Sequence, residues 1–454
     1  MPRIAILGAG ITGLAAAMRL RDAAEIAIYD ADNRAGGCVQ TVRENGFTME
    51  LGPDSLLVDK PAGKALLQEL GLEDELVDIL PQFKGARIVR DGTLRKIPAD
   101  FRLFAPASLP ALLASGIFSP LGIARAAIEP FIPARRSPDD ESLASFVTRR
   151  FGREVLDRLA QPLIGGIYSG NPRRLSMQAT LPQFPELERK YGSLIRAMSA
   201  TRGDRRAPHL MALREGLGSM IEALERELAG AIHLRAEVTA LHRDGAQWRI
   251  AFRDGSYAQA DAVVCTLPAY AAAEILRGTE AELAALLDSI RYNSIATVNL
   301  AYAAADATGL PPATGFVVPN CEQHAITAAT ITTQKYPNRA PEGRVLLRAF
   351  VGGALQAALV ENSDDRLVAM VREEFARIVG ITAEPQLARV QRWTRLLPEY
   401  GVGHVTLVEQ IETRIASLPS LALAGSAYRG VGIPDCIASG ERAAARLLGT
   451  MSAV

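Results

Sequence analysis

The sequence of 454 residues contains few cysteines and histidines, and these are scattered along the chain. The four cysteines form no CxxC pair, which argues against a disulfide framework and a zinc site and fits a reducing compartment. The five histidines are equally dispersed, so we expect no metal cluster. Because the formal net charge is zero, we expect no nucleic-acid partner. We also expect no signal peptide, since an apolar run begins directly after Met1 and Pro2.

A long uninterrupted apolar run is also missing. The stretch from Leu103 to Ala124 has no charged residue, but it is interrupted by Pro106, Pro110 and Pro120. Each proline would leave backbone groups unsatisfied in lipid, so we predict short helices with an apolar face rather than a membrane-spanning helix. That face either enters one leaflet of a membrane, helped by nearby arginines, or lines an apolar pocket.

The charges are unevenly distributed despite the neutral total. Between Phe101 and Glu215 there are 17 Lys and Arg residues against 10 Asp and Glu residues. This basic middle region indicates an anionic ligand or surface, or it consists of solvated arginine-rich helices. The sequence leaves both interpretations open.

The sequence does contain a glycine motif directly after its first apolar run. The run from Arg3 to Leu7 is typical of a strand, Gly8, Gly10 and Gly13 follow it, and an alanine-rich helical pattern comes next. The first glycine permits a tight turn, the second lets a pyrophosphate approach the backbone, and the third lets the helix pack closely on the strand. A phosphate would then lie at the helix N-terminus.

A second apolar run, from Glu25 to Tyr29, ends in Asp30. This acidic residue lies about 20 residues after the first glycine, where it can accept hydrogen bonds from ribose hydroxyls. Together with the glycine motif it predicts a dinucleotide site in a Rossmann-like domain, but NAD and FAD both remain possible ligands.

Further segments add to this pattern. Gly36-Gly37 predicts a turn that lets backbone pass close to a phosphate or ribose, and Gly52-Pro53 predicts a rigid turn or an ordinary loop. A loop containing Gly432 follows a predicted buried C-terminal strand. Pro162 to Gly170 forms a glycine-rich loop or, as the local pattern favours, a turn that ends a helix. We also predict a strand over Ile232 to Val238 and an amphipathic helix over Asp364 to Val379. These last three predictions rest on local pattern alone.

Together these segments resemble the flavin amine oxidase superfamily and, within it, the protoporphyrinogen/coproporphyrinogen III oxidase family. The matching motifs are Gly8 to Leu14, Arg34 to Gly37, Glu50 to Ser55, Gly165 to Asn171, Lys335 to Gly343, Leu397 to Tyr400 and Gly430 to Ile437. The resemblance implies an α/β fold with an FAD-binding Rossmann-like domain of the glutathione-reductase type, an antiparallel-sheet substrate domain and a helical, membrane-associating insertion. These would comprise residues 1–65, 208–270 and 415–454; 66–98 and 271–414; and 99–207, respectively.

The resemblance also implies a function: FAD-dependent oxidation of a porphyrinogen to a porphyrin in heme biosynthesis, with O2 as acceptor and H2O2 released. The substrate would be protoporphyrinogen IX or coproporphyrinogen III. Other interpretations of the same fold are an amine or carotenoid oxidoreductase and a non-catalytic, prenyl-lipid escort-like binding protein. We expect a cytoplasmic location, with peripheral association at the inner face of the cell membrane and handover to a ferrochelatase-type enzyme as open possibilities.

Residue by residue, the resemblance implies noncovalent FAD binding and one substrate contact. The cofactor residues would be Gly8, Ala9, Gly10, Ile11, Thr12, Gly13, Asp30, Ala31, Arg34, Gly36, Gly37, Gly52, Pro53, Asp54, Ser55, Val238, Trp393, Val431, Gly432 and Ile433. Arg102 would bind a propionate of the substrate, although some relatives lack it. No catalytic acid or base is assigned. The sequence departs from the family pattern at Cys38, where many members have Arg, and at Tyr336, where Trp or Phe is frequent.

Overall fold

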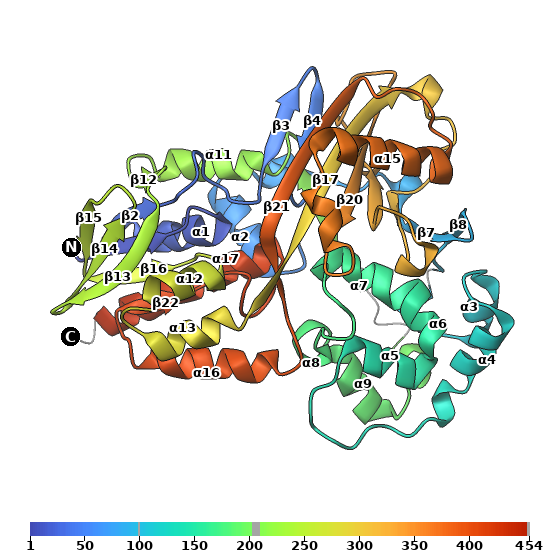
Figure 1. Cartoon of the computed structure of the whole chain (residues 1–454), viewed down its shortest axis with the longest axis horizontal. Coiled ribbons are helices and arrows are strands. Elements are labelled where there is room, and N and C mark those ends of the chain that lie inside the picture. The colour runs from blue at the N-terminus through green and yellow to red at the C-terminus, as the bar shows by residue number, and fades with distance from the viewer. Residues whose placement is uncertain (99, 202–208, 452–454) are drawn as a thin grey trace.

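The computed structural model describes residues 1–98, 100–201 and 209–451. Figure 1 shows three regions: one built on a parallel sheet beside both chain ends, one built on a largely antiparallel sheet, and one made of short helices.

The first region is organised around a five-stranded parallel sheet with the order β12-β2-β1-β16-β22. Its strands come from distant parts of the chain: β1 (Arg3–Leu7), β2 (Glu25–Tyr29), β12 (Ile232–His233), β16 (Ala262–Cys265) and β22 (Leu421–Leu423). Ile4 of the central strand is in register with Ile26 on one side and Ala262 on the other. Because both faces of this strand are covered, its apolar residues are continuous rather than alternating.

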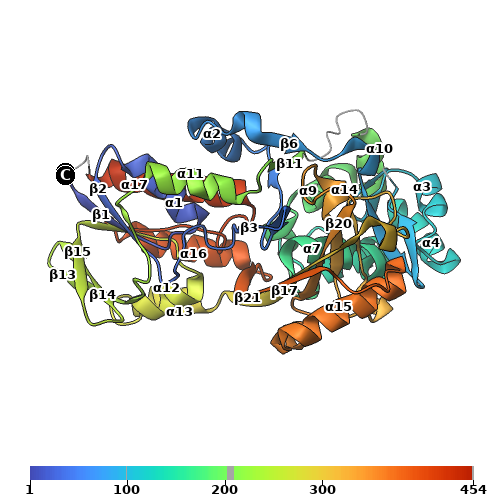
Figure 2. The same ribbon diagram turned by 90° about the horizontal axis from the view of Figure 1, so that it is seen from above.

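Successive side chains of β1 pack into two different layers. Ile4 and Ile6 join a core with α1 (Ile11–Leu20), α2 (Pro61–Glu69), α11 (Gly218–Glu227) and α17 (Ile433–Met451). Ala5 and Leu7 join another core with α12 (Ala269–Leu276), α13 (Ala281–Asp288), α16 (His404–Ala416) and the meander β13 (Val238–Asp244), β14 (Gln247–Phe252) and β15 (Tyr257–Ala260). Figure 2 shows α1 and α11 on one side of the sheet and α12 and α13 on the other.

The second region contains a seven-stranded sheet with the order β21-β17-β20-β19-β18-β7-β8. Its strands are β7 (Ala86–Arg90), β8 (Thr93–Lys96), β17 (Arg291–Ala303), β18 (Gly315–Val317), β19 (Ala328–Ile331), β20 (Arg344–Gly352) and β21 (Leu387–Glu399). All neighbours are antiparallel except β18 and β7. Helix α15 spans Asp364–Val379, as predicted, and packs its apolar face into the core of this sheet.

Shorter strands connect the regions. They form the hairpin β3 (Thr41–Glu44) and β4 (Phe47–Glu50), the three-stranded sheet β5 (Leu56–Leu57), β11 (Leu210–Leu213) and β6 (Leu76–Asp78), and the hairpin β9 (Phe101–Arg102) and β10 (Ala105–Pro106).

The third region consists of helices that share one apolar core. They are α3 (Leu109–Ala114), α4 (Pro120–Ala127), α5 (Leu143–Phe151), α6 (Arg153–Val155), α7 (Gln161–Tyr168), α8 (Met177–Thr180), α9 (Gln183–Tyr191) and α10 (Leu194–Ala200). The fully buried Arg150 pairs with the equally buried Glu129, which also accepts hydrogen bonds from the Ser193 hydroxyl and the Leu194 amide. The stretch interrupted by prolines forms the short helices α3 and α4, as predicted. Among the described residues, no helix combines the length and the hydropathy required to cross a membrane.

One of two local predictions was confirmed and the other was wrong. The stretch from Pro162 to Gly170 is the end of a helix and not a loop throughout, because α7 includes both Gly165 and Gly166 and its C-cap, Ser169, is left-handed with φ 47°. A π-helical turn over Leu156–Ala160 leads directly into α7. The helix then continues through both glycines, so tertiary packing outweighs their poor helix propensity. The strand predicted over Ile232 to Val238 is divided: β12 ends at His233, and β13 begins only at Val238.

Candidate active site

The glycine motif forms the predicted strand, turn and helix. Gly8 has φ 103°, and Gly10 is the N-cap of α1, whose first turn has no side-chain cap. A methyl group added at Gly13 would lie 2.0 Å from the carbonyl oxygen of Gly8, whereas one added at Gly10 would meet nothing within 4 Å. Packing therefore requires Gly13 but not Gly10. The free space at Gly10, beside the uncapped helix N-terminus, fits the pyrophosphate of a dinucleotide.

Asp30 lies at the end of β2 and holds the glycine motif in place. One carboxylate oxygen accepts a hydrogen bond from the Ala9 amide at 2.6 Å, and the other accepts one from the Asp32 amide at 2.8 Å. Each oxygen retains a further acceptor position, so the carboxylate can still bind ribose hydroxyls. The Ala236 amide donates to the Asp30 carbonyl, so the segment leading to Val238 runs beside this end of the motif.

The second glycine pair packs directly on the first motif. The Gly36 amide donates to the carbonyl of Ala9 at 2.8 Å. The guanidinium of Arg34 donates to the carbonyl oxygens of Ala35 and Gly37, so it stabilises this turn from within. The two turns together form a continuous backbone surface at the N-terminus of α1.

A cavity of about 350 Å³ continues from this surface toward the second sheet. Predicted cofactor residues from four chain segments line it: Ile11, Gly52, Pro53, Asp54, Ser55, Trp393, Val431, Gly432 and Ile433. Lining residues that were not predicted are mostly apolar: Ile167, Ile295, Phe350, Leu396, Leu397 and the charged Arg348. A concave, mainly apolar site with few polar groups is typical of an organic cofactor and substrate.

A buried ionic network forms the polar wall of this cavity. The Asp54 carboxylate lies 2.8 Å from the Lys335 ammonium and 2.8 Å from the Arg348 guanidinium, and it accepts a hydrogen bond from the Ser55 hydroxyl at 2.7 Å. Arg348 also donates to the Gly52 carbonyl at 2.7 Å, which fixes the Gly52 turn against β20. Burial alone would raise the pKa of Asp54, but Lys335 and Arg348 hold it well below its ordinary value.

Sequence reasoning assigned no role to Arg348 or Lys335. The available signal for Arg348 was a charged residue within an otherwise apolar predicted strand, Val345 to Val351. Lys335 and Tyr336 begin a family motif, and the Tyr336 hydroxyl donates to the Ser55 hydroxyl at 2.7 Å. Tyr336, which stands where Trp or Phe is frequent in the family, therefore stabilises the turn from Gly52 to Ser55.

Two predicted residues lie outside this arrangement. Arg102 is exposed on β9 and is not among the residues that line the cavity. Val238 starts β13 near Asp30, away from the cavity and toward the end where an adenosine would lie. The structure thus separates the Asp30 end of the predicted cofactor residues, the glycine turns and the cavity.

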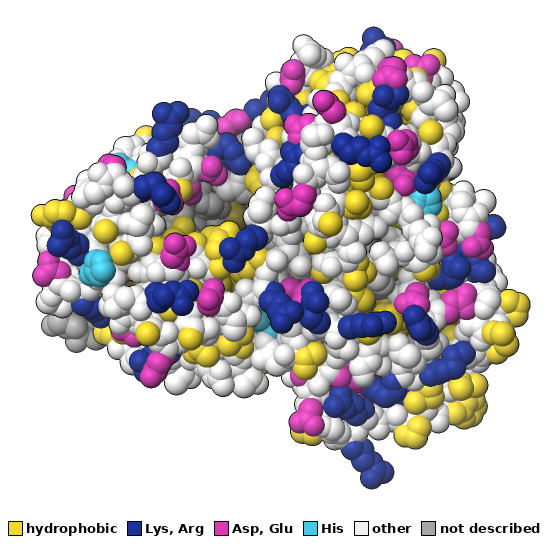
Figure 3. Space-filling model, in the orientation of Figure 1, with side chains coloured by type: hydrophobic (Ala, Val, Ile, Leu, Met, Phe, Trp, Pro, Cys, Tyr) yellow, Lys and Arg dark blue, Asp and Glu magenta, His cyan; other side chains and the backbone are white. Residues whose placement is uncertain are grey.

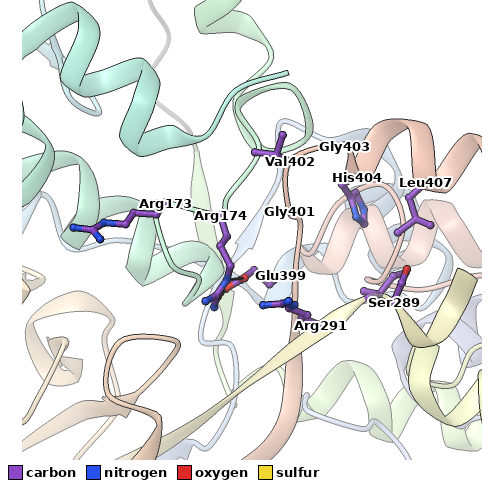
Figure 4. A pocket seen from close by; sticks show the side chains of 11 residues that line it. Arg173, Arg174, Ser289, Arg291, Glu399, Gly401, Val402, Gly403, His404 and Leu407 are labelled. Atoms are coloured by element: carbon purple, nitrogen blue, oxygen red, sulfur yellow. Dashed lines mark hydrogen bonds and ion pairs between the residues drawn. The ribbon is translucent and has the colours of Figure 1, made fainter. Parts of the chain in front are cut away.

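A second cleft, of about 460 Å³, lies at the junction of the three regions. Figure 4 shows Arg174 directed toward Glu399 and Arg173 directed away. The Glu399 carboxylate lies 2.5 Å from Arg174; burial would raise its pKa, but this pair and several hydrogen bonds lower it. Although this cleft is larger, none of the predicted cofactor residues lines it, so the smaller cavity is the candidate active site.

Comparison with known proteins bears on the cofactor. The family model described as flavin containing amine oxidoreductase matches residues 11–448. The chain belongs to this family. The predicted flavin cofactor and oxidoreductase class are thereby confirmed, and they agree with the glycine surface and the adjoining cavity.

Full-length relatives of this flavin-containing family are also similar in sequence. The chain is 35% identical to the coproporphyrinogen III oxidase of Bacillus subtilis (strain 168), with 97% of this chain and 96% of that protein covered. It is 32% identical to the coproporphyrinogen III oxidase of Staphylococcus aureus (strain NCTC 8325 / PS 47), with 98% of each covered. It is 27% identical to the chloroplastic protoporphyrinogen oxidase of Nicotiana tabacum, with 98% and 85% covered.

Solved structures share the fold. The chain matches a candidate protoporphyrinogen oxidase from Exiguobacterium sp. 255-15 with a TM-score of 0.90 and 33% identity, covering 99% of both chains. A reduced UDP-galactopyranose mutase matches with a TM-score of 0.75 at 18% identity, covering 99% of this chain and 96% of that one, which shows the fold alone. The predicted α/β flavin amine oxidase fold is confirmed.

Proposed function

We propose that this chain oxidises a porphyrinogen to a porphyrin in heme biosynthesis, with noncovalently bound FAD and with coproporphyrinogen III as substrate. The similarity to coproporphyrinogen III oxidases over nearly the whole chain carries this proposal. The apolar cavity beside the predicted flavin-binding loops supports it, because a macrocycle needs a concave apolar surface next to the redox group. Protoporphyrinogen IX is the second candidate substrate, since a protoporphyrinogen oxidase is also similar to this chain.

The chain's contribution to the reaction is positioning. Bound FAD supplies the hydride acceptor. The glycine turns hold its pyrophosphate, and the apolar walls orient the macrocycle and exclude water. O2 is the proposed final acceptor, with H2O2 released.

Proton transfer by the cavity walls is not part of the proposal. Among the described residues, the charged side chains lining the cavity, Asp54 and Arg348, are paired with each other. Burial raises the pKa of the lining Cys436 thiol to about 12, so it stays protonated. This leaves no side chain in the described cavity wall that is poised as a general base at neutral pH.

The test is anaerobic incubation of the FAD-loaded protein with each porphyrinogen, followed by admission of air. Porphyrin fluorescence and H2O2 should both rise well above the rate of autoxidation without enzyme, and faster with coproporphyrinogen III. If neither porphyrinogen is oxidised faster than in the enzyme-free sample, the proposal is wrong. A fully active preparation without flavin absorbance would contradict the cofactor assignment.

Peripheral membrane association is a further part of the proposal. The side chains of Leu121 and Phe131 in the helical region are 83% and 82% exposed, and Leu113 and Ile128 are also exposed. Figure 3 shows hydrophobic side chains gathered at the edge of this region. Such an exposed apolar patch, on a region rich in arginine, fits the interface of a membrane. From that surface the porphyrin would pass to a ferrochelatase-type enzyme.

A further inference from the structure

The candidate cavity lacks a free cation for a carboxylate. Among its described lining residues the positive charge is Arg348, which is bound to Asp54 and to the Gly52 carbonyl. A porphyrinogen of the proposed kind carries propionate carboxylates, and burying an unpaired carboxylate is costly. Its macrocycle therefore suits the interior, while its carboxylates must meet positive charge at the rim.

An irregularity in β21 shapes one part of that rim. Trp393 is in register with Ile295, and Leu397 is in register with Asn293. Ser294 alone therefore lies opposite residues 394–396. Bulges of this type re-aim side chains and are frequent beside active sites. Here Trp393, Leu396 and Leu397 all line the cavity, although strict alternation would direct successive side chains to opposite faces.

Arg395 lies within this bulge and adopts a left-handed conformation with φ 48°. This region is unfavourable for residues other than glycine, and such strain clusters at functional sites. The Arg395 amide donates to the Ser294 hydroxyl at 3.0 Å, which holds the strained turn. The residue is exposed, and it directly precedes the cavity-lining Leu396.

The guanidinium of Arg395 rests on an aromatic ring rather than on a carboxylate. It lies 3.8 Å from the centroid of the Tyr270 ring, and within the described chain no Asp or Glu forms an ion pair with it. Tyr270 packs edge-on against Tyr292 at 5.1 Å, and the Tyr292 hydroxyl accepts a hydrogen bond from the Ala269 amide. The cation is therefore pre-positioned on a supported aromatic platform with its charge still available.

We propose that Arg395 forms a carboxylate-binding subsite at the rim of the cavity and anchors a propionate of the substrate. This inference rests on the proposed function for the identity of its ligand. A guanidinium binds a carboxylate through paired, charge-assisted hydrogen bonds, which fix orientation as well as affinity. Arg395 would thus orient the macrocycle from the β21 side of the cavity.

Binding can be measured without turnover by titrating the FAD-loaded protein with fluorescent coproporphyrin III and with its tetramethyl ester. Arg395→Gln should weaken binding of the free acid about tenfold, as expected for loss of one charge-assisted contact, and should leave binding of the ester unchanged. Arg395→Gly should do the same, and glycine tolerates the left-handed conformation, so this variant keeps the fold. Arg249→Gln is the matched control, because Arg249 also stacks on a tyrosine, Tyr257, but in the meander.

The inference is overturned if wild-type protein binds acid and ester equally, or if both Arg395 variants weaken the two ligands to the same extent. Oxidation of coproporphyrinogen III is assayed in parallel on the same samples. Selective binding of the acid through Arg395 without oxidation would contradict the proposed function and support the subsite. Oxidation of coproporphyrinogen III together with unchanged binding of the acid in both Arg395 variants would support the proposed function and contradict the subsite.

Discussion

The hydroxyl of Tyr400 accepts a hydrogen bond from the backbone amide of Gly430 over 2.8 Å. The same hydroxyl donates to the Ser426 carbonyl at 2.5 Å, so one buried side chain joins both ends of the loop that leads to the cavity. Its ring stacks on His404 at 4.1 Å, and the His404 Nε2 donates to the Tyr428 carbonyl at 3.0 Å. Ser426 at the start of this loop and Val431 at its end both line the cavity.

Tyr400→Phe should therefore loosen the loop while preserving the ring stack. Without the hydroxyl, a partly buried amide and a partly buried carbonyl lose their partner, and an unsatisfied buried group costs up to about 1–3 kcal/mol. We expect a lower free energy of unfolding and weaker FAD binding, measured by urea denaturation and by FAD fluorescence on release. Tyr302→Phe is the control, since the buried Tyr302 hydroxyl has no hydrogen-bond partner among the described residues. Equal loss of FAD in both variants would contradict the proposed bridging role.

Burial lowers the pKa of His404, and this predicts a dependence of stability on pH. Below the unfolded-state pKa of about 6.5 the unfolded chain binds a proton that the folded chain does not. The free energy of unfolding should therefore fall as the pH decreases from about 6.5, by up to about 1.4 kcal/mol per pH unit for this one group, until the lower folded-state pKa is reached. His404→Gln should flatten the profile in this range, whereas the exposed His242→Gln should keep its slope. An unchanged slope in His404→Gln would show that other groups produce it.

The glycine motif predicts that binding and folding can be separated. Gly10→Ala introduces a methyl group that meets nothing within 4 Å, at a φ of −69° that alanine readily adopts. We expect its apoprotein to melt like wild type but to bind FAD at least about tenfold more weakly, because the methyl group occupies the pyrophosphate position. Gly13→Ala should instead lower the melting temperature itself, since its methyl group would lie 2.0 Å from the Gly8 carbonyl oxygen. Normal FAD affinity in Gly10→Ala would place the pyrophosphate elsewhere.

Asp54→Asn should be strongly destabilising. It leaves the partly exposed Lys335 and the buried Arg348 without their shared carboxylate, and breaking a buried ion pair from one side costs up to about 3–5 kcal/mol. Urea denaturation of the FAD-loaded variant measures this loss. Asp157→Asn removes the partner of Arg153 in an exposed ion pair and should cost no more than about 1 kcal/mol. Similar values for the two variants would mean that the buried network contributes little.

The exposed apolar patch predicts reversible binding to vesicles. Leu121→Ser combined with Phe131→Ser should reduce co-sedimentation with anionic phospholipid vesicles several-fold, because less apolar surface enters the membrane interface. Porphyrinogen oxidation in detergent should remain unchanged, since neither residue lines the cavity. Equal sedimentation of the double variant and wild type would exclude this patch as the membrane contact.

The sequence by itself determined the elements whose conformation depends on residues that are close in the sequence. The strand, turn and helix from Arg3 to Leu20 follow from the positions at which only glycine avoids a clash. Helix α15 has the predicted bounds, because a Ser363 cap, a 3.6-residue apolar period and a terminal Gly380 all act locally. The dinucleotide site belongs to the same category, since its phosphate-binding backbone is contiguous in sequence.

Only the tertiary structure decided the candidate cavity and its charges. Asp54 meets Lys335 and Arg348 over sequence separations of 281 and 294 residues, and no periodic pattern encodes such a pairing. The continuation of α7 through Gly165 and the bulge at Arg395 likewise depend on what packs against them, which outweighs local propensity. Arg102, chosen by resemblance, is exposed on β9, whereas the proposed propionate-binding Arg395 lies in a shift of strand register that becomes visible only when β17 and β21 pair.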